Sequence, residues 1–473
     1  MRQLSGLDNS FLAMETPTTY GHVSSLAIFE PGEHTLTFSE VRDLVAERLH
    51  LVAPFRRRLV TVPLGLDHPF WIEDPDFDLD YHLRHIAVPP PGDERQLAEL
   101  AAELAAKHLD RRRPLWEMYI IEGLEGGAVA ELTKIHHACI DGVSGAEILG
   151  VLLDISANPP PVPPPAKPWR PEHEPSQVEL LGRGVAGLLA KPRVGFRLAR
   201  RAVPRLGAIA NNFQLGLPTL RRPREILSSP GTQAPRTPMN GTITPHRRFA
   251  FGSLPLSDIK LVKQQLGGTV NDVVMAMCAG VLRTWLIEHD ALPSDPLLAM
   301  VPVSVRTDEQ RGTFGNRVSA MVVELPTNER DPLVRYERVQ AATRLAKEQH
   351  GAIPAEVLQD FAQFTPPSVL GMASRVAARS KIADRVNPPF NVVISNVPGP
   401  QFPLYSAGAM LRGIYPLSAI TDGIGLNMTL MSYNGNLDFG LLACREMIPD
   451  IWRMIEALGE ELAVLVKAAR AEG

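Results

Sequence analysis

The sequence concentrates proton-transfer chemistry in one short string, HHACIDG, which runs from His136 to Gly142. An imidazole has a pKa near neutrality, so a histidine held in a fixed orientation can take a proton from a hydroxyl, an amine or a thiol. With average residue usage, a chain of this length should contain such a match by chance in about one case in a thousand. The alternative is a pair of structural histidines whose hydrogen bonds are satisfied in a core.

Each residue of the string can be given a role. We assign His137 as the general base because Asp141 follows it at the spacing H-x-x-x-D. Asp141 is expected mainly to hold the loop through an arginine, for which Arg306 is the candidate, and a triad-like hydrogen bond to the imidazole is the less favoured role. His136 would orient the substrate or support an oxyanion through its backbone N–H. Gly142 lets the chain turn tightly into the following helix.

No nucleophile motif accompanies this base. The sequence contains no GxSxG string. Cys139 lies inside HHACIDG, but it is more typical of a small buried side chain than of a nucleophile. A base without a nucleophile predicts that an activated acceptor attacks a bound acyl donor directly, in a ternary complex where positioning supplies much of the acceleration.

The composition describes a folded protein and excludes several classes. The chain has 473 residues, 45% of them hydrophobic and 21% charged, so two domains are the default expectation. A net charge of −4 gives no polyelectrolyte character that would indicate nucleic-acid binding. Three scattered cysteines without CxxC spacing predict reduced thiols in the cytoplasm and no metal site. We find no signal peptide and no apolar run long enough to span a bilayer.

Alternating strand and helix patterns divide the chain into three parts. Residues 1–157 form an N-terminal α/β half in which the strand pattern Ala128–Ile135 leads directly to the histidines. Residues 158–245 hold a proline cluster and a basic crossover. Residues 246–473 form a second α/β half with a long apolar helix at Asn271–His289. The other strand patterns of this half lie at Leu297–Val303, Asn391–Ser395, Gly425–Ser432 and Leu437–Ala443.

The crossover has an unusual charge pattern. From Leu180 to Arg224 the sequence contains no Asp or Glu but many arginines, and apolar residues recur at helical spacing. A basic amphipathic segment in a weakly acidic protein is typical of an interfacial helix attracted to anionic lipid. A linker whose apolar side packs on the two halves accounts for the pattern equally well.

Several strings resemble those of a known family. HHACIDG resembles the HHxxxDG signature of CoA-dependent acyltransferases and of condensation domains in nonribosomal peptide synthesis. Further strings are similar to motifs of the bacterial wax ester synthase/diacylglycerol acyltransferase family, and they occur in that family's order over nearly the full chain. These strings are Leu4–Thr16, Pro114-Leu115-Trp116, Asn271-Asp272, SNVPGP at Ser395–Pro400, and Ser432–Gly440. The resemblance is strongest to the mycobacterial triacylglycerol synthases.

This resemblance implies a fold and a reaction. The fold would be two chloramphenicol-acetyltransferase-like domains of mixed α/β type, joined by the crossover, with the active-site histidine in a tunnel between them. The donor would be a long-chain acyl-CoA, and the acceptor a diacylglycerol or a fatty alcohol, giving triacylglycerol or a wax ester. No cofactor beyond the acyl-CoA substrate is implied. We expect a cytoplasmic protein associated peripherally with the inner membrane or with lipid droplets.

The resemblance also implies roles for individual residues. His137 would be the general base, and Asn271 would approach the site from the second half. Mainly structural roles fall to Pro114, Leu115, Trp116 and Asp272, and residues of the substrate path would be Ser395, Asn396, Pro398 and Gly399. The DFGWG strand of acetyltransferase relatives is replaced here by Asp438-Phe439-Gly440-Leu441-Leu442, so CoA docking is open to a different arrangement.

Each secondary motif also has a structural explanation. Trp116 is more often a core anchor than a ligand. Asn271 fits the N-cap of its helix, where Asp272 would favour the positive end of the helix dipole. SNVPGP is a rigid turn by composition alone.

Two other functions stay open at this point. One is a condensation-type acyltransferase that takes its donor from a carrier protein. The other is a non-catalytic lipid-binding protein that uses the same tunnel and the basic crossover to coat lipid stores.

Overall fold

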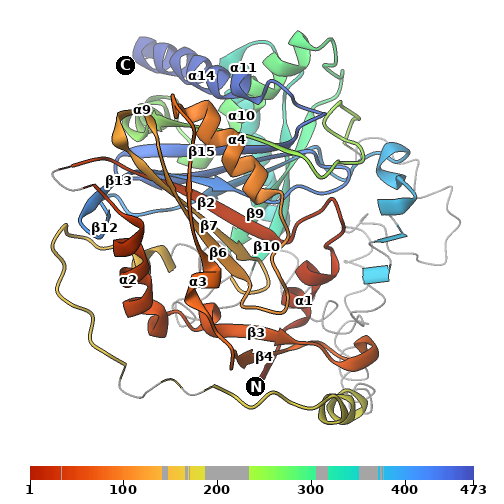
Figure 1. The fold of residues 1–473 in the computed structure, drawn as a ribbon. Helices are drawn as coiled ribbons and strands as arrows, with labels where there is room; N and C mark the ends of the chain where they lie inside the picture. Colours follow the sequence, from red (N-terminus) through yellow and green to blue (C-terminus); the bar gives the residue numbers. More distant parts are fainter. Residues whose placement is uncertain are drawn as a thin grey trace, which may run out of the picture.

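Two six-stranded mixed sheets and one small antiparallel sheet organise the computed structural model (Figure 1). The structure describes residues 1–32, 35–140, 148–165, 169, 171–186, 234–304, 318–350, 371–372, 375–376 and 378–472. The first sheet has the order β12 (Tyr405–Ser406), β13 (Ala409–Leu417), β2 (His22–Phe29), β7 (Val129–His136), β6 (Trp116–Glu122) and β5 (Leu83–Ala87). The second has the order β10 (Val318–Leu325), β9 (Leu297–Ser304), β11 (Val392–Val397), β14 (Leu426–Tyr433), β15 (Asn436–Cys444) and β8 (Arg247–Pro255).

The third sheet is small and lies at the N-terminal edge of the molecule. It has the order β1 (Arg2–Gln3), β4 (Phe70–Glu73) and β3 (Arg57–Val60). Figure 1 shows this sheet beside the N-terminus, below the first large sheet.

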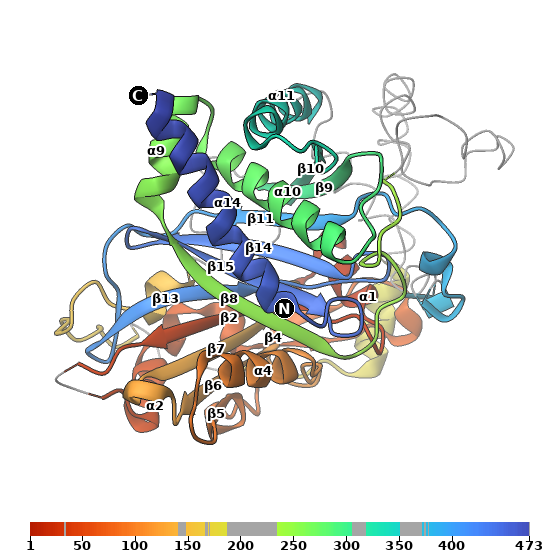
Figure 2. The same cartoon turned by 90° about the horizontal axis from the view of Figure 1, so that it is seen from above.

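Helices cover the large sheets. The first half contributes α1 (Gly6–Ala13), α2 (Phe38–Arg48), α3 (Leu79–His82) and α4 (Glu94–Ala105). The second half contributes α9 (Leu256–Leu266), α10 (Val270–Glu288), α11 (Pro332–His350) and α14 (Ile451–Glu472). Figure 2 shows the second group together over the second sheet. The predicted mixed α/β class is therefore confirmed, and the predicted strand before the histidines is present as β7.

Strand β7 ends at His136, and its two faces are buried by different partners. Ala130 and Leu132 pack with the apolar face of α4, whereas Val129 and Ile135 pack into a second cluster on the opposite face. All eight residues of β7 are buried. Such a central strand is rigid, so the turn that follows it begins at a well-defined position.

The C-terminal part of the chain contributes strands to the first sheet as well. Strand β13 lies in the C-terminal part of the sequence, yet it pairs antiparallel with β2 of the first sheet, with Ile414 opposite Ala27. The carboxylate of Asp438 on β15 accepts the backbone N–H of Ile414 at 2.8 Å and the hydroxyl of Ser253 on β8 at 2.6 Å. The predicted boundaries at 157 and 245 stay a prediction, but the sheets do not separate along the chain there.

Helix α10 is long and apolar enough in composition to cross a membrane, and most of it is buried inside the protein. Its side chains pack in the cluster that also contains residues of β9, β14 and α14. The apolar sequence of α10 is therefore explained by its place in the second core. Its N-cap is Thr269, whose hydroxyl accepts the backbone N–H of Asp272 while the Asp272 carboxylate accepts from Thr269.

Candidate active site

His137 begins the turn that follows β7. Its backbone N–H donates to the carbonyl of Gly21 at 2.9 Å. Its ring stacks on the ring of Phe11 from α1, with centroids 4.6 Å apart and planes 11° apart. The side chain is half-buried. The imidazole is thus oriented by an aromatic neighbour while part of it stays accessible, which is the arrangement a general base needs.

His136 is buried, with a hydrogen bond at Nδ1 and a carboxylate near Nε2. Nδ1 accepts the backbone N–H of Ala138 at 3.0 Å, so the proton of the neutral ring resides on Nε2. Nε2 lies 3.3 Å from Oε1 of Glu15. Burial lowers the pKa of His136, although Glu15 opposes this shift. His136 is therefore a neutral positioning group at neutral pH.

The backbone of His136 does not fit the oxyanion role. Its N–H donates to the carbonyl of Leu115 at 3.0 Å, as part of the ladder between β7 and β6. An N–H that already has a backbone acceptor cannot also be directed at a tetrahedral intermediate. The expectation that this N–H supports an oxyanion is wrong, because the strand extends one residue further than its hydrophobic pattern indicates.

Glu15 connects the histidines to the N-terminal segment. Oε1 accepts the backbone N–H of Gly21 at 2.9 Å, and Oε2 accepts Nε of Arg111 at 3.1 Å. Burial alone would raise the pKa of the Glu15 carboxyl, but hydrogen bonds with His108 and His136 and the charge of Arg111 bring it well below its ordinary value. A buried carboxylate thus stays ionised beside the histidine pair.

Gly21 is required by its closeness to His136. A Cβ built on Gly21 would lie 2.5 Å from Nε2 of His136 and 3.0 Å from the carbonyl oxygen of Phe11. Those distances are far shorter than van der Waals contact, so only glycine fits. Sequence reasoning assigned no role to Phe11, Glu15, Gly21 or Arg111. Phe11 and Glu15 could have been found from the N-terminal string LSGLDNSFLAMET, which contains both residues.

The string Pro114-Leu115-Trp116 helps to fix the strands around the histidines. The Leu115 carbonyl fixes His136, as described above. The Trp116 ring is buried between Phe55, at 4.2 Å, and His82, at 4.5 Å, and its Nε1–H donates to the Phe55 carbonyl at 2.9 Å. Trp116 is therefore a core anchor that fixes β6 against its neighbours.

Asn271 lies in the first turn of α10 and is half-buried. It is not the N-cap, because Thr269 has that position and Asp272 completes the capping box. Within the described part of the chain, Asn271 makes no hydrogen bond to either histidine. Its role in catalysis stays a prediction.

The SNVPGP string comprises the last three residues of β11, in the second sheet, and the turn that follows. Ser395 and Asn396 are half-buried on β11, and Pro398 is exposed. The N–H of Gly399 donates to the hydroxyl of Ser432 at 3.1 Å, and a Cβ there would lie 2.3 Å from the Ser432 carbonyl oxygen.

This turn lies at the contact between the two halves. Val397 packs against the apolar cluster that contains Ala138, Cys139 and Ile140, the residues directly after His137. Met431 and Tyr433 of β14 belong to the same cluster. SNVPGP and the histidine turn thus meet the same apolar cluster, and Val397 pairs with Met431 there, whereas the lining of a substrate path by SNVPGP stays a prediction.

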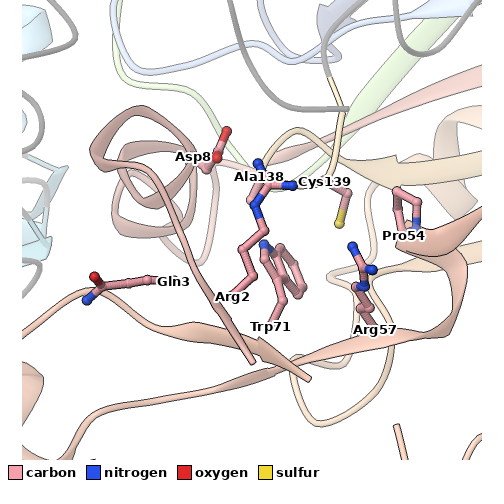
Figure 3. A pocket seen from close by; sticks show the side chains of 8 residues that line it. All are labelled: Arg2, Gln3, Asp8, Pro54, Arg57, Trp71, Ala138 and Cys139. Carbon is pink, nitrogen blue, oxygen red and sulfur yellow. The ribbon is translucent and has the colours of Figure 1, made fainter. Parts of the chain in front are cut away.

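A pocket adjoins the residues after His137. It is lined by Arg2, Gln3, Asp8, Pro54, Arg57, Trp71, Ala138 and Cys139. Figure 3 shows Arg2 and Arg57 extending from the small sheet toward Ala138 and Cys139. Burial raises the pKa of the Cys139 thiol, which removes it as a thiolate nucleophile near neutral pH. All lining residues belong to the first half, so the expected tunnel between the halves stays a prediction.

Three predicted site residues lie outside the described residues: Asp141, Gly142 and Arg306. Among the described residues, no group of three or more metal-ligating side chains is present.

Comparison with known proteins identifies the family. A family model for the wax ester synthase/diacylglycerol acyltransferase catalytic domain matches residues 4–274, and one for the WS/DGAT C-terminal domain matches residues 314–465. The chain belongs to the wax ester synthase/diacylglycerol acyltransferase family. It is 37% identical to a putative diacylglycerol O-acyltransferase of Mycobacterium tuberculosis, over 99% of this chain and 91% of that one. It is 35% identical to the O-acyltransferase WSD of Acinetobacter baylyi, over 98% of this chain and 96% of that one.

Solved structures agree with this membership. The wax ester synthase/diacylglycerol acyltransferase from Marinobacter aquaeolei superposes with a TM-score of 0.69 at 31% identity, covering 99% of both chains. The first condensation domain of the calcium-dependent antibiotic synthetase has a TM-score of 0.57 at 17% identity, covering 99% of this chain and 96% of that one. The second likeness concerns the fold alone. The predicted acyltransferase fold and family are therefore confirmed, and the protein is an acyltransferase.

Proposed function

We propose that this protein transfers a long-chain acyl group from acyl-CoA to the free hydroxyl of diacylglycerol, with a fatty alcohol as a second acceptor. The relatives named above are a diacylglycerol O-acyltransferase and an O-acyltransferase. The observation that carries the mechanism is the orientation of the His137 ring by Phe11, on a backbone that is fixed by the Gly21 carbonyl.

In this mechanism His137 takes the proton of the acceptor hydroxyl while the oxygen attacks the thioester carbonyl carbon. The tetrahedral intermediate then expels the CoA sulfur as the C–S bond breaks. The sulfur receives the proton from His137, so the products are the ester and free CoA and the imidazole is neutral again. The raised pKa of Cys139 favours this direct transfer over an acyl-enzyme.

The proposed role of Asn271 is to orient a substrate from the second half. Because Thr269 caps the helix, capping does not account for Asn271, and its half-buried amide makes no hydrogen bond to the described residues. An Asn271→Ala variant should lose activity without loss of thermal stability, whereas a capping residue would lose both.

We further propose that the protein acts in the cytoplasm at an anionic membrane or lipid-droplet surface. The support is the sequence Leu180–Arg224, which lacks acidic residues and is rich in arginine. Acceptor and product are both insoluble in water, so a catalyst that stays at the interface reaches them more often.

The test replaces the base. A His137→Ala variant should form no ester from palmitoyl-CoA and diolein while it still binds palmitoyl-CoA, as measured by calorimetry. His68→Ala, at another histidine of the first half, is the control for general damage. Turnover by His137→Ala equal to that of the unaltered protein would remove His137 from the mechanism. Faster turnover with palmitoyl-acyl carrier protein than with palmitoyl-CoA would favour the condensation-type reaction instead.

A further inference from the structure

The small sheet and a helical segment form a compact unit at the edge of the molecule. Residues 177–186 are helical and pack on the sheet through Leu180, which is buried with Val60 and Ile72. Gly184, one turn further, is so close to the loop after β3 that a Cβ would lie 2.7 Å from the side chain of Val62. We call residues 57–73 and 177–186, together with β1, the edge unit.

The outward side of this helix is apolar as well. Val178, Leu181 and Val185 follow one another at spacings of three and four residues, which places them on one face. All three are exposed, and Val178 is 80% exposed. A helix that is apolar on two sides normally has both sides covered. Here the inward side meets the sheet, and the outward side meets no described part of the protein.

A fourth exposed apolar side chain lies in the loop that packs against this helix. Leu64 lies between Val62 and Leu66, the two residues that Gly184 approaches, and it is 83% exposed. Its φ is 58°, in the left-handed region that leucine rarely adopts. A strained and fully exposed leucine contributes nothing to the folded core, so its position needs another explanation.

We propose that Leu64, Val178, Leu181 and Val185 are the surface by which the protein inserts into an anionic lipid interface. The inference rests on the proposed function, and it assigns the contact to specific side chains. Contiguous exposed apolar side chains mark interaction surfaces, and a lipid interface accepts them without a complementary pocket. Charge favours the same occupant, because the chain that continues from this helix has no acidic residue up to Arg224.

The edge unit also contacts the residues that follow the catalytic base. Arg2, Arg57 and Trp71 of the unit form one wall of the pocket whose other wall is Ala138 and Cys139 (Figure 3). Those two residues directly follow His137 in the sequence. The helix covers the other face of this sheet, where Leu180 packs on Val60 and Ile72, so the sheet lies between the proposed lipid contact and the pocket.

The experiment uses the full chain and a matched control. One variant carries Leu64→Ser, Val178→Ser, Leu181→Ser and Val185→Ser. The control carries Ile287→Ser, Leu345→Ser and Val464→Ser, which remove similarly exposed apolar side chains from α10, α11 and α14. Both are floated with vesicles of equimolar phosphatidylglycerol and phosphatidylcholine, and with vesicles of phosphatidylcholine alone.

We expect the edge-unit variant to bind the anionic vesicles at least about tenfold more weakly than the unaltered protein does. The control should bind like the unaltered protein. Equal vesicle binding by the edge-unit variant and the unaltered protein would overturn the proposal. So would a dimer that becomes a monomer in the variant with unchanged vesicle binding, since the surface would then bind a second copy. Should the fourfold variant fail to fold, Leu64→Ser and Val178→Ser alone decide, each with an expected threefold loss.

A second assay separates this inference from the proposed function. With palmitoyl-CoA and a water-soluble short alcohol, the edge-unit variant should keep the turnover of the unaltered protein, because no interface is needed. Its turnover on diolein presented in anionic vesicles should fall with its vesicle binding. If the unaltered protein makes no ester in either assay, the proposed function fails, and flotation still decides the docking surface.

Discussion

The carboxylate of Glu15 lies 3.3 Å from Nε2 of His136 at the end of β7. Through Gly21, the same carboxylate also fixes the carbonyl that holds the backbone of His137. One buried acid in the N-terminal segment thus positions both histidines of the site.

A Glu15→Gln variant should show the importance of this charge. The amide can still accept from Gly21, but the negative charge beside the histidines is lost and Arg111 loses its carboxylate partner. We expect kcat to fall about 100-fold, since small displacements of a catalytic group have effects of that size. The acid limb of the pH–rate profile should move to lower pH, because an imidazolium is less favoured without the carboxylate. Glu103→Gln, at an exposed pair with Lys107, is the control. An unchanged pH profile would reduce Glu15 to a purely structural group.

Replacing Gly21 by alanine should displace His136. The added methyl carbon would meet Nε2 at 2.5 Å, so the ring or the Gly21 backbone has to move. We expect a loss of about 1–3 kcal/mol in the free energy of unfolding, typical of overpacking, together with a large fall in kcat. Gly32→Ala is the matched control, because no atom lies within 4 Å of a Cβ at that position. Wild-type kinetics for Gly21→Ala would mean that His136 can shift freely.

A Phe11→Leu variant isolates the ring stacking on His137. Leucine keeps the apolar bulk but loses the aromatic face, which is worth about 0.5–1.5 kcal/mol in stacked pairs. If stacking orients the base, kcat should fall about threefold to tenfold with KM for palmitoyl-CoA unchanged. Phe38→Leu removes a comparable stack on His85, with ring centroids 5.0 Å apart, away from the site and should leave kcat unchanged. Equal kinetics for the two variants would contradict an orienting role.

Glu131 should make stability depend on pH. It is buried on β7, and burial raises its pKa to about 7 although the Thr133 hydroxyl donates to it. Since the folded protein binds this proton more tightly than the unfolded chain, stability is highest below the ordinary pKa and falls as the pH rises toward 7. A Glu131→Gln variant should therefore gain up to about 3 kcal/mol of stability at pH 8.5 and nothing at pH 4. Urea unfolding at the two pH values measures the difference, with exposed Glu125→Gln as the control. Equal gains at both pH values would show that Glu131 does not titrate in this range.

Local patterns predicted the strand before the histidines, because the apolar residues Val129, Ala130, Leu132 and Ile135 recur over the length of one strand. The long helix from Val270 was also predictable, since its apolar length has few alternatives. Strand β13 was not predicted. Its sequence, AMLRGIYPL, includes a glycine and a proline, and its partner β2 lies almost four hundred residues earlier in the chain. Nothing local to the segment indicates that partner.

The site was predicted in the same uneven way. The spacing HHACIDG identified the base, whereas the groups that orient it come from an N-terminal segment whose contact with β7 depends on tertiary packing. The closeness of Gly21 to His136 is visible only in three dimensions. The capping of α10 by Thr269 was missed because Asn271 and Asp272 are also good capping residues, and the choice between them depends on where the chain enters the helix.

The pairing of β13 with β2 has a consequence for biosynthesis. The first sheet contains β2 near the beginning of the chain and β13 near its end, so the ribosome has to finish almost the entire polypeptide before this sheet can be completed. Until then an edge of β2 stays unpaired and open to pairing with other nascent strands. The first sheet can therefore be completed only after synthesis is nearly finished, and this pairing of distant strands is slow. Chaperones that shield sheet edges should raise the soluble yield of the protein.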